Sequence, residues 1–207
     1  LVDHQGDDGS FPRAWKYDGT VDKAEKTNTT HPIRFLTRMA EFTGEQKYLD
    51  AAIAAGEFAL TELGGSMTYI GGTPDNPNVI DKEAGGMAMN AFLALHDAVD
   101  DAAEKKRWLA AAVRAADFTE TWLMAWGWPI PNTPRPAYRR EAALGLSLIA
   151  TGHSGVDNWL CYQSANFFEL GRLTRDQHFI EVAKVLTSTS LRTTQLPGND
   201  VGHDRAG

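Results

Sequence analysis

Apolar residues recur every three or four positions along much of the chain, which is the spacing of one face of an α-helix. Phe35, Leu36, Met39 and Phe42 follow this spacing. The pattern continues through a second set of positions, namely Leu49, Ala52, Ile53, Gly56, Leu60 and Leu63. No long segment needs a β-strand to explain its pattern. We therefore expect an all-α protein.

A short motif occurs twice between such helical stretches. Phe42-Thr-Gly-Glu-Gln-Lys-Tyr48 aligns without gaps with Leu173-Thr-Arg-Asp-Gln-His-Phe179, and the two share an apolar residue, a Thr, an acidic residue, a Gln and an aromatic residue in register. A middle copy carries an insertion at 100–106, after which Trp108-Leu-Ala-Ala-Ala112 resumes the pattern. A period of roughly 60 to 70 residues indicates a repeated helical hairpin, with each motif as the turn between two helices.

Three hairpins are expected on this basis. Their helices cover Phe35–Phe42 with Leu49–Leu63, Glu83–Val99 with Glu104–Trp126, and Val156–Leu173 with Gln177–Leu191. The links at 64–82 and 127–153 are long and rich in Gly, Pro, Asn and Trp, and long ordered loops often carry function. Because the short turns lie at one end of the hairpins, the links lie at the other end, beside the start of each first helix. We expect the functional residues at this rim.

Composition narrows the class of protein. The chain has 207 residues, of which 43% are apolar, and this is typical of one globular domain covering 1–207. The single Cys161 allows no internal disulfide. No apolar run reaches the ~20 residues that span a bilayer, and the net charge of −7 argues against nucleic acid as a partner. We expect a soluble protein without a membrane partner. The sequence does not fix its compartment, and a secreted or periplasmic location stays open.

Four motifs lie in the N-terminal segment and in the links. They are Gln5-Gly-Asp-Asp-Gly-Ser-Phe11, Asn76-Pro-Asn-Val-Ile-Asp-Lys-Glu83, Trp126-Gly-Trp128-Pro and His153-Ser-Gly-Val-Asp157-Asn. Together with the hairpins they resemble the (α/α)-toroid proteins, particularly the six-hairpin glycosidase-like superfamily and related polysaccharide lyases. The resemblance implies an (α/α)6-type ring, with the first helices inside and the long loops forming a sugar-binding cleft. About three hairpins are present, so we expect an incomplete toroid whose open wall is covered by its remaining part or by another subunit.

Three acidic residues stand where the long links enter first helices. Glycoside hydrolysis needs two carboxyl groups, one to protonate the leaving oxygen and one to act as base or nucleophile. Asp157 is the first candidate, and Asp81 or Glu83 is the second. Helix capping explains the same positions, because Asp81 can cap its helix, Glu83 can complement the helix dipole, and Ser154-x-x-Asp157 fits a capping box. His153 is a candidate assisting base or substrate contact.

Other rim residues are candidates for binding a sugar. Flat sugar faces pack on aromatic rings, and this makes tryptophans in the loops possible platforms. Arg13 could pair with the carboxylate of an acidic sugar, and His31 occupies a similar rim position. The full set of predicted substrate-binding residues is Trp126, Trp128, Trp15, Arg13, His31 and Asn158. Each also has a structural explanation, as a loop anchor, a turn former or a solvated side chain.

The sequence thus predicts a glycoside hydrolase that acts on an oligosaccharide or polysaccharide, uronic-acid-containing ones included. No cofactor or metal site is expected. Two alternatives stay open, a polysaccharide lyase of the same fold and a non-catalytic helical-repeat module that binds a glycan or a protein. Asn28-Thr29-Thr30 additionally fits an acceptor site for N-glycosylation.

Overall fold

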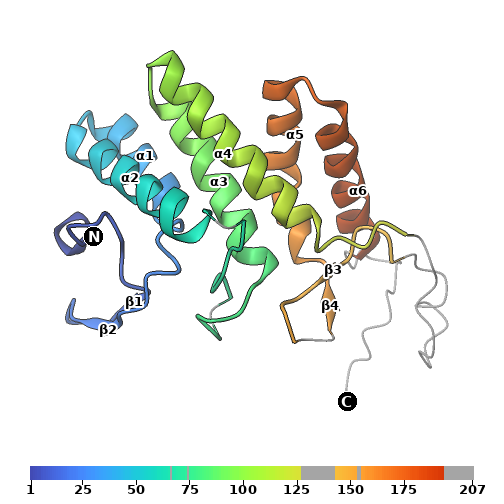
Figure 1. Ribbon diagram of the computed structural model, residues 1–207, viewed down its shortest axis with the longest axis horizontal. Helices are drawn as coiled ribbons and strands as arrows, with labels where there is room; N and C mark the ends of the chain where they lie inside the picture. The colour runs from blue at the N-terminus through green and yellow to red at the C-terminus, as the bar shows by residue number, and fades with distance from the viewer. Residues whose placement is uncertain (66, 74, 127–142, 153–154, 194–207) are drawn as a thin grey trace. The chain divides into compact units, whose positions relative to one another are not determined.

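The computed structural model describes residues 1–193 apart from 66, 74, 127–142 and 153–154 (Figure 1). Its described residues form mainly α-helices, which confirms the all-α class. The helices are α1 (Ile33–Thr43), α2 (Gln46–Phe58), α3 (Lys82–Ala98), α4 (Ala102–Glu120), α5 (Ser164–Thr174) and α6 (Gln177–Thr193). They pair in sequence order, so the three predicted hairpins are present. None of the described helices is long and apolar enough to cross a membrane.

The chain divides into two compact units, which are described separately. The first unit comprises residues 1–121 with 150–152, and the second comprises residues 122–149 with 153–207. The first unit therefore contains the hairpins α1–α2 and α3–α4, and the second contains α5–α6. In the first unit, the hairpins meet through contacts that include α1 with α3.

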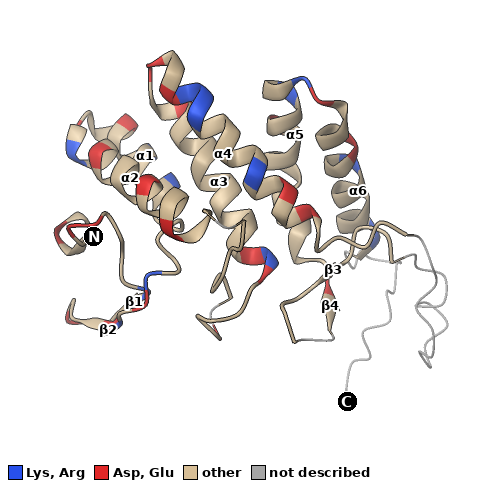
Figure 2. Cartoon of the chain, in the orientation of Figure 1, with Lys and Arg blue, Asp and Glu red and all other residues tan. Residues whose placement is uncertain are grey.

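Small residues let the helices of the first unit pack closely. The rings of Phe92 and Trp108 lie nearly parallel with their centroids 6.0 Å apart, and both side chains are fully buried. Gly56 of α2 lies against Trp108 of this pair, and an added Cβ would overlap Leu95 and press on Trp108. Charged residues of α3 are confined to its two ends (Figure 2). The charged side chains of α3 therefore lie only where the helix joins the adjacent loops.

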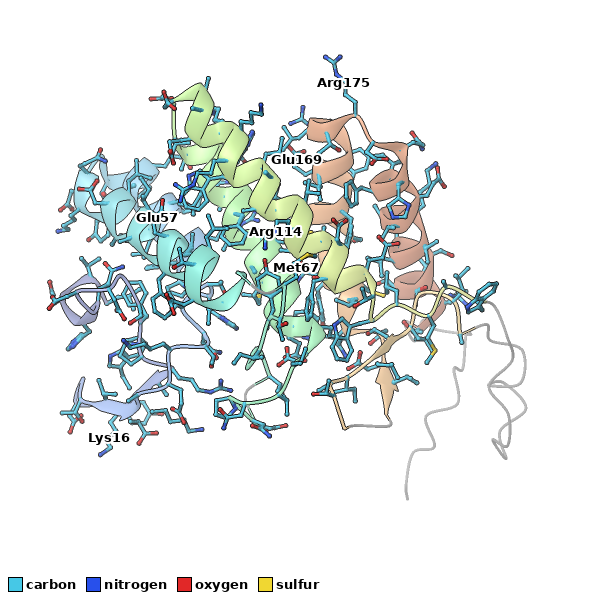
Figure 3. All side chains as sticks on the ribbon, viewed as in Figure 1. Lys16, Glu57, Met67, Arg114, Glu169 and Arg175 are labelled. Carbon is cyan, nitrogen blue, oxygen red and sulfur yellow. The ribbon has the colours of Figure 1, made fainter. Side chains whose placement is uncertain are left out.

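The two turns with matching sequences also have matching geometry. In each, the Thr hydroxyl donates to the carbonyl four residues earlier, at 2.7 Å for Thr43 and 2.8 Å for Thr174. The same hydroxyl accepts the backbone N–H two residues later, at 3.2 Å in both turns. The next residue is left-handed in both, with φ of 73° at Gly44 and 60° at Arg175, whose side chain points away from the helices (Figure 3). The repeated motif is thus a helix-ending turn.

Two helix boundaries differ from the sequence prediction. α4 ends at Glu120 and does not reach Trp126, because Leu123 forms a β-bridge with Ser147. α5 begins at Ser164 and not at Val156. There, β4 (Val156–Asp157) pairs with β3 (Ser147–Leu148) in an antiparallel ribbon, and a 3-10 helix, Trp159–Gln163, leads into α5. Residues that the periodicity assigned to helices are therefore found in paired β-strands.

The remaining elements are short. The N-terminal segment contains a 3-10 turn (Val2–His4) and an antiparallel ribbon of β1 (Ala14–Trp15) and β2 (Val21–Lys23). A π-helical turn, Ala59–Leu63, extends α2. The predicted insertion at 100–106 lengthens a helix, because α4 starts at Ala102 with Asp101 as its N-cap.

Candidate functional site

The N-terminal motif docks its segment on α2. The Gln5 side-chain amide donates to the carbonyl of Gly9 at 2.8 Å and to that of Ala51 at 2.9 Å. Gly9 has φ of +83°, and a Cβ there would overlap the carbonyl of Ala54. Only glycine adopts this backbone beside another chain without strain. The motif therefore explains how the segment that carries Arg13 is held against the first hairpin.

Arg13 joins the N-terminal segment to the link before α3. Its Nη1 donates to Thr27 Oγ1 at 3.2 Å, to Asn28 Oδ1 at 2.7 Å and to the carbonyl of Gly71 at 2.8 Å. Its Nη2 donates to the carbonyl of Thr73. The side chain is half-buried. Two predicted parts of the rim are thus fixed to one another by a single guanidinium group.

Arg13 also fixes the orientation of its neighbours. Because the Asn28 Oδ1 accepts from Arg13, the Asn28 Nδ2 is the group that faces His31 Nε2, at 3.4 Å. An amide nitrogen is a donor, so Nε2 accepts and the neutral imidazole carries its proton on Nδ1. Burial lowers the pKa of His31, a hydrogen bond with the backbone of Asn28 opposes this, and the charge of Arg13 lowers it further. We call Arg13, Asn28 and His31 the Arg13 cluster.

Asp81 holds the other side of the same link. The residue is fully buried, and its Oδ1 accepts the N–H of Ala84 at 2.7 Å, which caps α3. Its Oδ2 accepts the N–H groups of Gly72 at 2.9 Å and Thr73 at 3.3 Å. Burial raises the pKa of Asp81, and the backbone hydrogen bonds oppose that rise. Both oxygens are engaged away from solvent, so capping accounts for Asp81 and we leave it out of the catalytic proposal.

The loop 71–73 consequently lies between a cation and an anion. Its carbonyl groups bind Arg13, whereas its N–H groups bind Asp81. Glu83 is half-buried in the first turn of α3, beside this loop in sequence. Sequence reasoning missed Lys82, whose side chain is fully buried at the first position of α3. Lysine is rarely buried to this extent, so no local pattern could have indicated it.

Asp157 organises the start of the second unit's hairpin. Its Oδ1 accepts from Ser147 Oγ at 3.1 Å and from the backbone N–H of Trp159 at 3.0 Å. The next residue, Asn158, is exposed and donates to Thr193 Oγ1 at 2.7 Å. Asp157 thus begins the turn that leads into the 3-10 helix, and its carboxylate is half-buried. Ser154, its proposed partner in a capping box, lies outside the described residues.

The other predicted residues fall in different places. Trp126 belongs to the second unit and is 69% exposed, as a surface platform requires. Trp15 is half-buried in β1, with its ring 6.4 Å from that of His4. Trp128 and His153 lie outside the described residues. The structure therefore brings Arg13, His31 and the loop before α3 together in the first unit, and Asp157 with Asn158 in the second.

A surface hollow of about 420 Å³ in the first unit was not predicted from the sequence. Lys26 lies in it, with Nζ 2.5 Å from Asp8 Oδ2 and 5.8 Å from the centre of the Phe58 ring. The lining residues are Asp8, Lys26, Glu57, Phe58, Thr61 and Glu62. Within the described ranges, no group of three or more His, Cys, Asp or Glu residues is arranged to hold a metal ion.

Comparison with known proteins gave no relative: no protein-family model, no curated protein and no solved structure matches the chain.

Proposed function

We propose that this protein is a glycoside hydrolase built on an (α/α)-toroid scaffold and that it acts on an oligosaccharide or polysaccharide. One observation carries the proposal most directly. The link that enters α3 is held in a fixed conformation between Arg13 and Asp81, at the rim where the sequence predicts substrate binding. A catalytic site needs polar groups that are positioned before substrate arrives. Three hairpins, two of which share the same turn geometry, supply the supporting scaffold.

Asp157 and Glu83 are the carboxylates that we propose as candidates for acid or base catalysis, each within its own unit. Both residues are half-buried, whereas Asp81 is fully buried. Glycoside hydrolysis needs one carboxyl group to protonate the leaving oxygen and another to act as base or nucleophile. His153 remains the proposed assisting group, and Trp126 with Trp128 the proposed stacking platforms.

Turnover of polysaccharides tests the proposal. The protein is incubated with neutral and uronic-acid polysaccharides while reducing ends and the absorbance of a conjugated double bond are followed together. Reducing ends without the absorbance support a hydrolase. If both signals rise, the enzyme is a lyase and the hydrolase proposal is wrong.

A second candidate function is a non-catalytic module that binds a glycan or a protein. It is favoured by the role of Asp81, because one of the three acids predicted for catalysis is used in structural hydrogen bonds that cap α3 and hold the link. This candidate predicts that polysaccharide binds, as measured by calorimetry, while neither assay signal changes.

A further inference from the structure

The Arg13 cluster contains hydrogen-bond donors that have no acceptor among the residues that the structure describes. An arginine has five N–H groups, and those of Arg13 that are engaged belong to Nη1 and Nη2. Its Nε–H has no acceptor among the described residues. The acceptors of the other groups are a hydroxyl, an amide and two carbonyls. Within the described part of the chain, this half-buried cation therefore has only neutral partners.

His31 adds a further donor. The Asn28 amide holds the His31 proton on Nδ1, and this N–H is buried without a hydrogen-bond partner among the described residues. Buried donors without an acceptor are costly, so a group that supplies acceptors would be bound favourably.

We propose that the Arg13 cluster is a carboxylate subsite and, given the proposed function, that it recognises the carboxylate of a uronic acid unit in the substrate. An ionised carboxylate has only acceptors, and the cluster has only donors left to offer. The chain has a net charge of −7, so an acidic sugar needs a local cation of this kind. Arg13 and His31 are half-buried, so each keeps a part that is exposed to solvent.

A titration of the intact protein tests the subsite directly. D-glucuronate is added while the imidazole signals of His31 are followed by NMR over a range of pH. An anion beside the ring favours the protonated imidazole, so we expect the pKa of His31 to rise. D-glucose at the same concentration and sodium chloride at the same ionic strength should leave it unchanged. If glucuronate has no effect, or if chloride has the same effect, the proposal is wrong.

Two substitutions with equal change in charge provide a matched control. Arg13→Gln removes the proposed contact, whereas Lys16→Gln removes a charge from an exposed side chain of the same segment, which points into solvent (Figure 3). We expect Arg13→Gln to weaken glucuronate binding by about tenfold or more, and Lys16→Gln to leave it nearly unchanged. Equal weakening by both would overturn the proposal. Because Arg13 also holds the loop 71–73, the NMR titration of the unaltered chain decides the question if Arg13→Gln fails to fold.

The outcome is separable from that of the hydrolase assay, because glucuronate binding requires no turnover. A rise in the His31 pKa without hydrolysis of any polysaccharide would support the carboxylate subsite and contradict the hydrolase proposal. Hydrolysis of neutral polysaccharides without a glucuronate effect would support the hydrolase proposal and contradict the subsite.

Discussion

Asp81 organises a whole link through one carboxylate. It is fully buried and accepts three backbone N–H groups, so its removal leaves three donors without a partner. We expect Asp81→Ala to lower the free energy of unfolding by about 2–4 kcal/mol, which combines the loss of a helix cap with buried unsatisfied groups. Chemical denaturation followed by circular dichroism measures this change.

Asp101 is the matched control for that experiment. It caps α4 by accepting the N–H groups of Ala103 and Glu104, both at 2.9 Å, but these bonds are exposed. Water can replace the lost acceptor there, so Asp101→Ala should cost only about 1 kcal/mol. Equal losses at the two positions would show that burial is not what makes Asp81 important.

His31 predicts a dependence of stability on pH. Its pKa in the folded protein is below the usual value of 6.5, chiefly because of burial, so the unfolded chain binds the proton more readily. The stabilising contribution is therefore complete above the unfolded pKa and is lost as the pH falls through the folded pKa. We expect the free energy of unfolding to decrease on acidification below about pH 6.5 and His31→Gln to reduce this decrease. His4→Gln, at an exposed position, serves as the control and should leave the slope intact.

At the scale of elements, the two matching turns offer a paired test. Both place a residue in the left-handed region, which glycine adopts freely and other residues adopt at a cost of about 1–2 kcal/mol. We expect Gly44→Ala to destabilise the protein and Arg175→Gly to stabilise it, each by about 1 kcal/mol. Thermal unfolding of the two variants measures both signs. A destabilised Arg175→Gly variant would mean that the Arg175 side chain contributes more than its backbone strain costs.

The hairpins could be predicted because their signals are local. Helical periodicity and the Thr-x-acidic-Gln motif lie within a few residues of the turns they specify. The boundaries at Trp126 and Val156 could not be predicted in this way. These boundaries depend on the bridge between Leu123 and Ser147 and on the pairing of β4 with β3. Helical periodicity reports only on neighbouring residues, so it does not predict such contacts.

The candidate site was predictable only in part, for a similar reason. Arg13 and His31 were identified by their position at the rim, and the structure places both around Asn28. The sequence showed Asn28 only as part of a glycosylation motif. Its role depends on the direction of its amide, which is set by contacts between segments. Helix-capping chemistry at Asp81 was recognised as an alternative, because that pattern is local.

At the scale of the whole molecule, the proposed acids belong to different units, Glu83 to the first and Asp157 to the second. Each acid is therefore tested by itself. If it is catalytic, its substitution, Glu83→Gln or Asp157→Asn, should abolish turnover while helicity is retained. Reducing-end assays and circular dichroism on the two variants measure this. Retained turnover in either variant would remove that acid from the catalytic proposal.

The position of Asn28 also has a consequence for how the protein is made. Its amide, the atom group to which an oligosaccharyltransferase would attach a glycan, is held between Arg13 and His31, and Thr30 of the same acceptor motif is only 4% exposed. Attachment is therefore possible only before the first unit folds. A glycan attached to Nδ2 of the nascent chain would then occupy the position that faces His31, beside the Oδ1 that accepts from Arg13. In a glycosylating host, folding and modification would therefore compete for this one side chain.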